Sequence, residues 1–238
     1  MIAIAARAGP ARGRRWPGAV IASPAVRLRH HVNPLKGRFI EDSARRRAGW
    51  GARELDAERA LEVELGCADA QYLFQRAARH PEVRCLGIEI RADLVDEVNR
   101  RAEEQGLENL RAIFAHANLD LGELFQPSSL TRIFINFPDP WFKRRHHKRR
   151  LVDGALAATV ERLLRPGGGL LFQSDVFDLA LDAMAVLEET GLRNRYGPWS
   201  FVPGELAFAE LEARSLREDR CRDKGMPIWR LRYDRPGL

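Results

Sequence analysis

From residue 60 onward, short runs of hydrophobic residues alternate with longer segments in which hydrophobic residues recur every three or four positions. The short runs are typical of buried strands, and the longer period predicts amphipathic helices. Strands are expected at residues 60–65, 83–89, 110–115, 130–137, 169–175 and 227–234. Helices are expected to end near residues 79, 106 and 164, and a further one covers 176–190. This alternation predicts one α/β domain with a parallel, doubly wound sheet.

The segment at 227–234, PIWRLRYD, differs from the other runs because charged and apolar residues alternate along it. Side chains of a strand point alternately to its two faces. The pattern therefore predicts a strand with one face exposed to solvent.

The net charge is +6 at pH 7, but the positive charge is concentrated in two segments. Residues 1–40 carry seven Arg, one Lys and no acidic residue, and residues 143–150 (KRRHHKRR) carry six Lys and Arg with two His. Of the 39 Lys and Arg in the chain, 25 lie elsewhere, against 33 Asp and Glu. Clustered cations are typical of proteins that bind polyanions, because they displace counterions from neighbouring phosphates.

The composition also limits the classes of protein to which the chain can belong. The first segment is rich in Ala, Arg, Gly and Pro, so we expect a basic, disordered tail at 1–40 and one domain at 41–238. No stretch approaches the roughly 18 apolar residues of a membrane span. Three cysteines without a C-x-x-C pair argue against a disulfide scaffold and favour a reducing compartment, the cytoplasm. An integral membrane protein, a disulfide mini-protein and a coiled coil are excluded.

Two acidic residues flank the place where an α/β sheet of this kind binds ligands. Glu64 lies at the end of the first strand, before the turn Gly66-Cys67-Ala68-Asp69-Ala70, and Glu89 ends the second strand. A carboxylate at the second position can accept hydrogen bonds from a ribose diol, a pattern that nicotinamide and flavin proteins share. The turn lacks G-x-G-x-x-G, and Glu64 would repel a pyrophosphate but attract an ammonium group. Both features favour S-adenosylmethionine over a dinucleotide.

The fourth strand runs into FPDPWFKRRHHKRR at residues 137–150. Prolines on both sides of Asp139 fix φ and disfavour helix, so we expect its carboxylate to be held at the mouth of the sheet. Trp141 and Phe142 offer flat surfaces on which a nucleobase can stack, and the basic run can bind phosphates. This combination indicates a site for RNA.

The same segment resembles the signature of bacterial tRNA (guanine-N7-)-methyltransferases. The resemblance covers about residues 55–235 and includes LGCADA at 65–70, LGIEIR at 86–91, QSD at 173–175 and GMPIWR at 225–230. It implies a Rossmann-like, mostly parallel seven-stranded sheet with an antiparallel C-terminal strand. It also implies that S-adenosylmethionine is the cofactor, that tRNA is the partner and that N7 of the variable-loop guanine, position 46, receives the methyl group.

The resemblance implies roles for individual residues. Asp139 is the expected catalytic residue. The expected cofactor-binding residues are Glu64, Gly66, Glu89, His116, Asn118 and Asp139. The expected substrate-binding residues are Lys143, Asp175, Ser215 and Glu218, and the expected contacts to tRNA phosphates are Arg144, Arg145, Lys148, Arg149 and Arg150.

The chain departs from the family pattern at three places. Ala68 and Ala70 occupy positions where glycine is usual, His116 replaces an acid or amide for which Asn118 can substitute, and Ser215 replaces Thr. The first two keep open a catalytically impaired RNA-binding relative with a degenerate cofactor turn. A nicotinamide-dependent oxidoreductase is a third class.

Other properties are less specified by the sequence. His146 and His147 are adjacent, so their side chains diverge, and we expect no metal site. The sequence leaves open whether the protein is a monomer or a homodimer, which tRNAs it prefers and whether residues 1–40 bind RNA.

Overall fold

The structure is a computed structural model, which describes residues 60–204 and 213–237. The basic tail expected at residues 1–40 lies outside the described residues, as does the start of the expected domain. Among the described residues, no helix is long and apolar enough to cross a membrane.

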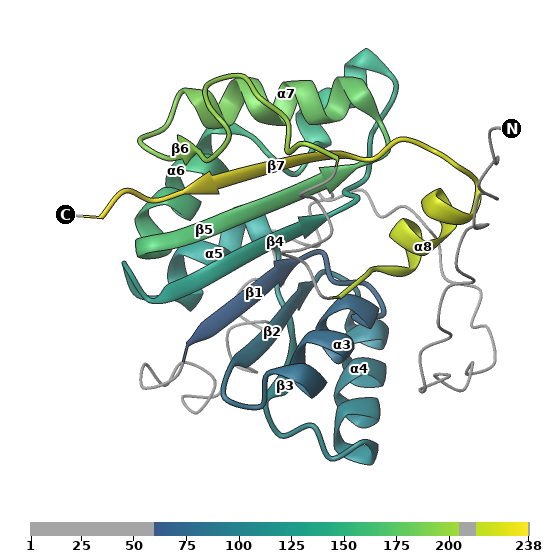
Figure 1. Cartoon of the computed structure of the whole chain (residues 1–238). Coiled ribbons are helices and arrows are strands. Elements are labelled where there is room, and N and C mark those ends of the chain that lie inside the picture. The colour runs from purple at the N-terminus through teal and green to yellow at the C-terminus, as the bar shows by residue number, and fades with distance from the viewer. Residues whose placement is uncertain (1–59, 205–212, 238) are drawn as a thin grey trace, which may run out of the picture. The chain divides into compact units, whose positions relative to one another are not determined.

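The described part of the chain forms one seven-stranded sheet with the order β3-β2-β1-β4-β5-β7-β6 (Figure 1). The first five strands are parallel to one another, and β7 is antiparallel to both β5 and β6. The strands are β1 (Leu61–Leu65), β2 (Arg84–Glu89), β3 (Leu110–Phe114), β4 (Leu130–Asn136), β5 (Leu164–Ser174), β6 (Arg193–Asn194) and β7 (Trp229–Asp234). The expected doubly wound sheet with an antiparallel C-terminal strand is confirmed.

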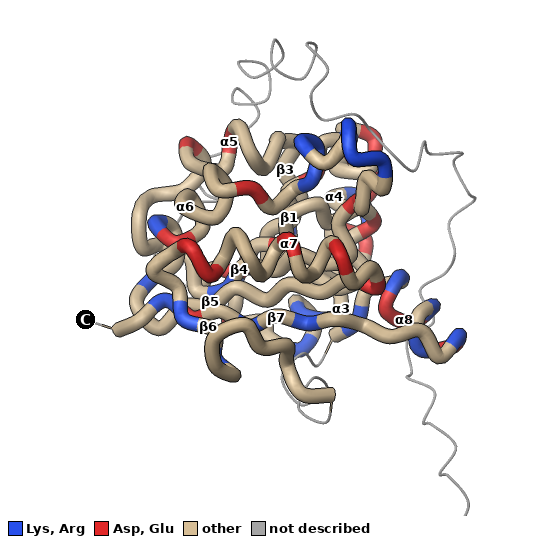
Figure 2. The backbone as a smooth tube through the Cα atoms, turned by 90° about the horizontal axis from the view of Figure 1, so that it is seen from above, with Lys and Arg blue, Asp and Glu red and all other residues tan. Residues whose placement is uncertain are grey.

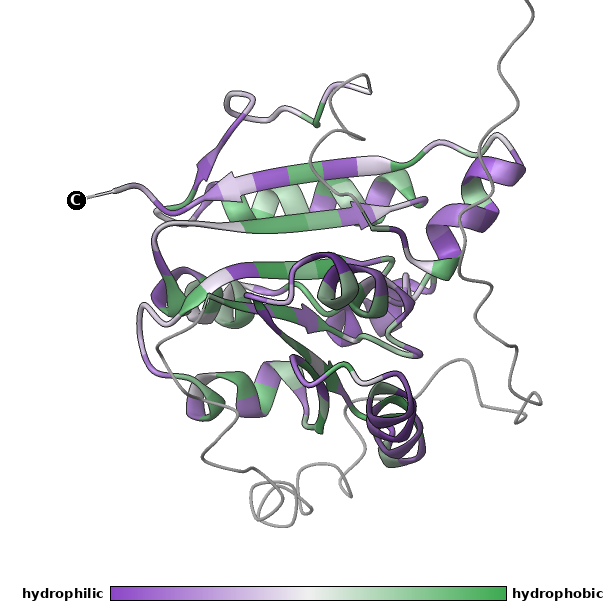
Figure 3. Ribbon diagram, turned by 60° about the horizontal axis from the view of Figure 1, so that its bottom comes forward, coloured by the Kyte–Doolittle hydropathy of each residue, from purple (hydrophilic) through white to green (hydrophobic). Residues whose placement is uncertain are grey.

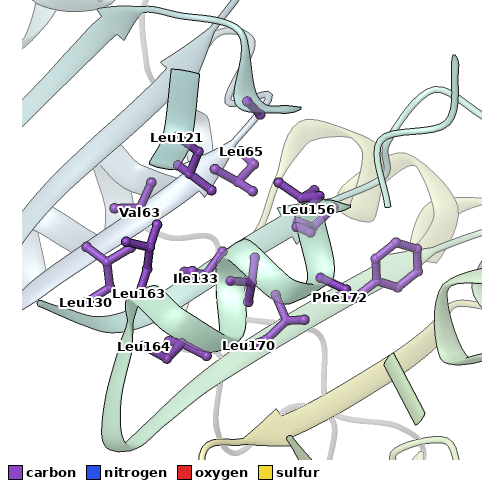
Figure 4. Close-up of a cluster of buried hydrophobic side chains, with 14 of the residues drawn as sticks. Val63, Leu65, Leu121, Leu130, Ile133, Leu156, Leu163, Leu164, Leu170 and Phe172 are labelled. Carbon is purple, nitrogen blue, oxygen red and sulfur yellow. The ribbon is translucent and has the colours of Figure 1, made fainter. Parts of the chain in front are cut away.

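Helices cover both faces of the sheet. One face packs α3 (Gln71–Arg79) and α4 (Ala92–Glu104) around a cluster that includes Leu73 and Val98. The other face packs α5 (Ala117–Leu124), α6 (Gly154–Leu163) and α7 (Phe177–Glu188) around a larger cluster (Figure 4). Hydrophobic residues accordingly follow the strands and the sheet-facing sides of the helices in Figure 3. The remaining elements are the short α8 (Leu216–Asp223) and a 3₁₀ helix, η2 (Arg144–Arg149).

The fifth strand is longer than expected. It begins at Leu164, directly after α6, and includes the RPGGG segment that was expected to separate helix from strand. The pairing of β4 with β5 shifts register between Leu130 and Arg132, as in a β-bulge. A Cβ at Gly168 would lie 2.8 Å from the carbonyl oxygen of Arg165 on the same strand and 3.0 Å from those of Leu130 and Thr131 on β4, so glycine lets the two strands approach this closely. Glycine therefore continues the strand through a bulge here rather than ending it.

The prediction that the last strand has an exposed face is wrong. Four of the six residues of β7 are buried, including Arg230 and Arg232. The strand lies between β5 and β6 in the sheet, and its two buried arginines are ion-paired, Arg230 with Glu218 at 2.8 Å and Arg232 with Asp234 at 2.9 Å. The alternation of charge thus marks internal ion pairs and not a solvent-exposed face.

Candidate active site at the carboxyl edge of the sheet

The order of the strands reverses between β1 and β4, which lie side by side at the centre of the sheet. The chain leaves β1 for α3 on one face and leaves β4 for α6 on the other. Open α/β sheets bind ligands outside the carboxyl ends of the strands at such a reversal. In Figure 1 the tips of β1, β4 and β5 point toward the end where α8 lies.

Glu64 reaches this edge from β1 and is only 3% exposed. Its Oε1 accepts a hydrogen bond of 2.7 Å from Nδ2 of Asn136 on β4. Its Oε2 is buried and has no hydrogen-bond partner among the described residues. Burial, together with the charges of Asp69 and Glu89, raises the pKa of Glu64 to about 8 despite the bond from Asn136. An unsatisfied buried carboxylate oxygen is a site for a cationic donor.

The turn after β1 keeps the backbone of a glycine-rich turn with only one glycine. Gly66, Ala68 and Ala70 have φ values of 75°, 51° and 54°. The left-handed region costs an alanine about 1 kcal/mol, which is small enough for the fold to absorb. The unusual alanines therefore adopt the conformation that glycines would have there, at some cost in backbone strain.

Close packing holds the same turn on β2. A Cβ at Gly87 would lie 2.4 Å from Sγ of Cys67. Glycine at this position of β2 lets the turn approach the strand. The packing brings the turn against the strand that carries Glu89.

Glu89 is 3% exposed, and its carboxylate is held on several sides. It accepts bonds from the backbone N–H groups of Ala68, Ile90 and Arg91 and from the guanidinium of Arg91 at 2.9 and 3.1 Å. Burial lowers the pKa of Arg91, but its hydrogen bond to Glu89 and the charges of Glu89 and Asp139 outweigh this effect and raise the pKa. A ribose diol at Glu89 would therefore share the carboxylate with Arg91.

His116 and Asn118 lie at the amino end of α5. His116 precedes the helix and is buried, and its backbone N–H donates to Asp120 at 2.8 Å. The amide of Asn118 donates to the carbonyl oxygen of Leu151 at 2.8 Å and to Asp153 at 3.2 Å. Asn118 thus ties α5 to the segment before α6, and its place in the cofactor site stays a prediction.

Asp139 lies in an irregular loop between β4 and η2 and is half-buried. Phe137 and Trp141, on either side of the Pro-Asp-Pro sequence, have φ values of 49° and 45°. Bulky residues rarely adopt this conformation, and such strain persists where the surrounding structure fixes it. Because β2 and β4 are both parallel to β1, the loop after β4 leaves the edge of the sheet at which β2 ends with Glu89. The charge of Asp139 contributes to the raised pKa of Arg91.

The basic run divides into two groups. Lys143, Arg144, Arg145 and Lys148 are exposed. Figure 2 marks the Lys and Arg positions of the described residues in blue along the backbone. Arg149 stacks on Trp141 at 5.0 Å, and Arg150 donates to the carbonyl oxygen of Pro140 and pairs with Asp182 on α7. The last two residues therefore anchor the loop.

The aromatic pair also divides into two roles. Trp141 contacts Arg149 and, edge-on at 5.8 Å, His146. Phe142 is 73% exposed. Of the two expected stacking surfaces, Phe142 is thus the one open to a nucleobase, and Trp141 supports the loop from within.

The expected substrate-binding residues lie at the far end of the same edge. Asp175 follows β5 and pairs with Arg217 on α8. Ser215 caps α8, because its hydroxyl accepts from the N–H of Glu218 at 3.2 Å. Glu218 is 1% exposed, and both its carboxylate oxygens accept bonds, from Arg230 at 2.8 Å and from Gln173 at 3.2 Å. Asp175 lies nearer to solvent than Glu218, which the structure places inside the protein.

Sequence reasoning missed four residues that hold this edge together, which are Asn136, Gln173, Arg91 and Arg230. Asn136 and Gln173 stand at or near the ends of predicted strands. Polar residues at these positions were the available signal. The described residues contain no group of three or more His, Cys, Asp or Glu placed to hold a metal ion.

Residues 58–231 match the family described as putative methyltransferase. The tRNA (guanine-N(7)-)-methyltransferase of Thermosynechococcus vestitus is 36% identical over 211 residues, which cover 88% of this chain and 95% of that protein. The protein of the same name from Myxococcus xanthus is 35% identical over 79% of this chain and 88% of its own length. The chain belongs to the tRNA (guanine-N(7)-)-methyltransferase family. The resemblance of the sequence is thereby confirmed.

Solved structures agree with this family on the fold. The aminoglycoside resistance methyltransferase NpmB1 superposes with a TM-score of 0.51 at 19% identity, covering 77% of this chain and 90% of its own. A geranyl diphosphate methyltransferase bound to sinefungin gives 0.51 at 17% identity over 74% and 72%. The Rossmann-like fold is thus confirmed, and S-adenosylmethionine is the cofactor of this methyltransferase family.

The residues present fit that cofactor. The unpartnered Oε2 of Glu64 can accept from an ammonium group, and the carboxylate of Glu89 lies at the end of the neighbouring strand. A carboxylate at the position of Glu64 would not suit a pyrophosphate, because like charges repel.

Proposed function

We propose that this protein transfers a methyl group from S-adenosylmethionine to N7 of guanine 46 in the variable loop of tRNA. The observation that carries the proposal is the position of Asp139. Its strained loop follows β4 at the edge of the sheet where β2 ends with Glu89, and four exposed cations follow it in the sequence. The relatives named above carry methyl transfer to N7 of guanine in tRNA in their names.

The cofactor would be held by Glu64 through its ammonium group and by Glu89 through its ribose. When bound, S-adenosylmethionine supplies a methyl group on a sulfonium that a nucleophile can attack. Guanine N7 has an in-plane lone pair and no proton at neutral pH, so the attack needs no general base. The work of the protein is to align the purine and to favour the charge that develops on it.

Asp139 suits both tasks. A carboxylate only accepts hydrogen bonds, so it binds the N1–H and N2–H₂ donors of guanine, which adenine does not present as a pair. Its negative charge also stabilises the positive charge that grows on the purine as the methyl group arrives. Asp175 can assist from the end of β5, and Lys143 can hold a neighbouring phosphate.

The decisive experiment incubates the full chain with unmodified tRNA and labelled S-adenosylmethionine, and then maps the product by chemical cleavage at 7-methylguanine. Cleavage at guanine 46 would support the reaction, the atom and the position together. Label at another nucleotide would refute the position, and tRNA binding without label would identify the catalytically impaired relative.

Removing exposed cations should weaken tRNA binding. We expect the triple variant Arg144→Gln, Arg145→Gln and Lys148→Gln to lower tRNA affinity and to reduce the slope of log K against log salt by about 2. Fluorescence anisotropy between low and moderate salt measures both quantities. These residues are exposed, so the fold should remain stable.

The matched control removes three charges from the opposite edge of the sheet, with Arg84→Gln, Arg111→Gln and Arg165→Gln at the amino-terminal ends of β2, β3 and β5. The control has the same net charge as the first triple variant. Equal loss of affinity in both would show that only total charge matters and would remove the basic run from the tRNA site.

A further inference from the structure

A continuous chain of hydrogen bonds crosses the carboxyl edge of the sheet from Arg230 on β7 to Glu64 on β1. Arg230 Nε donates to Gln173 Oε1 at 3.0 Å, and Gln173 Nε2 donates to Asn136 Oδ1 at 2.9 Å. Asn136 Nδ2 then donates to Glu64 Oε1 at 2.7 Å. One residue from each of β7, β5, β4 and β1 takes part, and all but Asn136 are buried.

The direction of these bonds follows from the chemistry of their first member. A guanidinium has donors and no acceptor. Arg230 therefore forces Gln173 to present its carbonyl to β7 and its NH₂ to Asn136. Asn136 must then present its own carbonyl to Gln173 and its NH₂ to Glu64. The guanidinium of Arg230 thus orients both amides, so that Asn136 presents an N–H donor to the carboxylate of Glu64.

Glu218 on α8 fixes the Arg230 end of this row of hydrogen bonds. Glu218 accepts from Arg230 at 2.8 Å with one oxygen and from Gln173 at 3.2 Å with the other. Glu218 is itself at the capped start of α8, where Ser215 accepts from its N–H. Glu218 therefore holds Arg230 and Gln173 in place, a structural role that agrees with its burial.

We propose that Arg230, Gln173 and Asn136 form a positioning relay that keeps an amide donor on Glu64 and so sets how strongly this carboxylate binds the ammonium group of the cofactor, with Glu218 fixing the far end. The proposal rests on the use of S-adenosylmethionine at Glu64, but not on which RNA is methylated.

The relay matters because burial and the charges of Asp69 in the turn and Glu89 on β2 oppose the ionisation of Glu64. Cys67 in the turn and Tyr72 on α3 are also close enough for the charge of Glu64 to raise their pKa values. Among the residues that the structure describes, the hydrogen bond that favours the carboxylate comes from Asn136. If the Asn136 amide turned over, its carbonyl would face Glu64 and would favour the protonated acid.

The test replaces Gln173 with methionine, which has a similar length and no N–H donor. We expect Gln173→Met to bind S-adenosylhomocysteine about 5- to 10-fold more weakly at pH 7, because Glu64 then holds its proton more tightly. We also expect binding at pH 8 to release roughly 0.3 proton more than in the wild type, since more Glu64 is protonated beforehand. Calorimetry in buffers of different ionisation enthalpy measures both.

The difference between the wild type and Gln173→Met in affinity and in proton release measures the effect of the relay alone. The ligand's own titration is common to both proteins and cancels in the difference. Gln126→Met, the same change at an exposed position, should match the wild type. Gln173→Leu carries the same expectation if methionine destabilises the sheet. Weaker binding without extra proton release would show a merely structural role and would overturn the proposal, as would unchanged binding. No RNA is present, so the outcome is independent of the tRNA assay.

Discussion

Replacing Asp139 with alanine is expected to lower the rate of methyl transfer by about 10³-fold, with the Kd of tRNA unchanged within about threefold. The carboxylate acts at the purine and on the charge that develops there, whereas affinity for tRNA comes mainly from cations and phosphates. Single-turnover transfer of a labelled methyl group, with tRNA in excess of its Kd, measures the chemical step directly.

Two further variants sharpen this prediction. Asp139→Asn keeps the size of the side chain and the strained loop, but its NH₂ would oppose the donors of guanine, so we expect it to be as inactive as Asp139→Ala. Asp96→Ala on the exposed side of α4 is the matched control and should keep full activity. Turnover retained in Asp139→Ala would remove the assigned role. Loss of tRNA binding in the same variant would assign Asp139 to binding rather than to the chemical step.

The fold was predictable where the period of the hydrophobic residues and the length of the run indicate the same type of element. The strands other than β6 and the helices α3, α4, α6 and α7 were located, because buried parallel strands form continuous apolar runs, whereas β6, α5 and α8 were not predicted. The bulge at Gly168 was not predictable, because it depends on how close β4 and β5 approach. The charges of β7 were misread for a related reason. Arg230 is buried because Glu218, twelve residues earlier in the chain, lies against it.

The candidate site was predictable as a set of positions but not as a set of contacts. Glu64, Glu89 and Asp139 were found from strand ends and flanking prolines, and the structure brings all three to one edge of the sheet. Arg150, an expected contact to tRNA phosphate, pairs with Asp182 on α7, a contact that no local pattern reveals, and its role at phosphate stays a prediction. Local sequence thus indicates which residues reach the carboxyl edge of the sheet. Tertiary packing decides which of their side chains are already paired with other residues and which can bind a ligand.

Replacing Glu64 with glutamine is expected to weaken S-adenosylhomocysteine binding about 10- to 100-fold at pH 7, since a charge-assisted bond is lost in a buried site. Glu64 has a pKa of about 8 and is mostly protonated at pH 7, so the ammonium group must displace a proton to bind. The wild type should therefore release roughly 0.9 proton more than Glu64→Gln at pH 7. Glu108→Gln, at an exposed position, should behave as the wild type in both measurements.

The same substitution should stabilise the fold. The pKa of Glu64 is higher in the folded chain than the ordinary value of 4.5, so its carboxyl group contributes full stability at low pH and loses it as the pH rises toward about 8. At pH 7 that loss is about 3 kcal/mol, and a buried, unbonded amide in the variant offsets about 1 kcal/mol of the gain.

Urea unfolding should thus show Glu64→Gln about 2 kcal/mol more stable than the wild type at pH 7 and nearly equal to it at pH 5. A difference that did not change with pH would contradict the buried, protonated carboxyl group. Weaker binding together with greater stability would show that this carboxylate is kept at a cost to the fold, because the ammonium group of the cofactor needs a partner there.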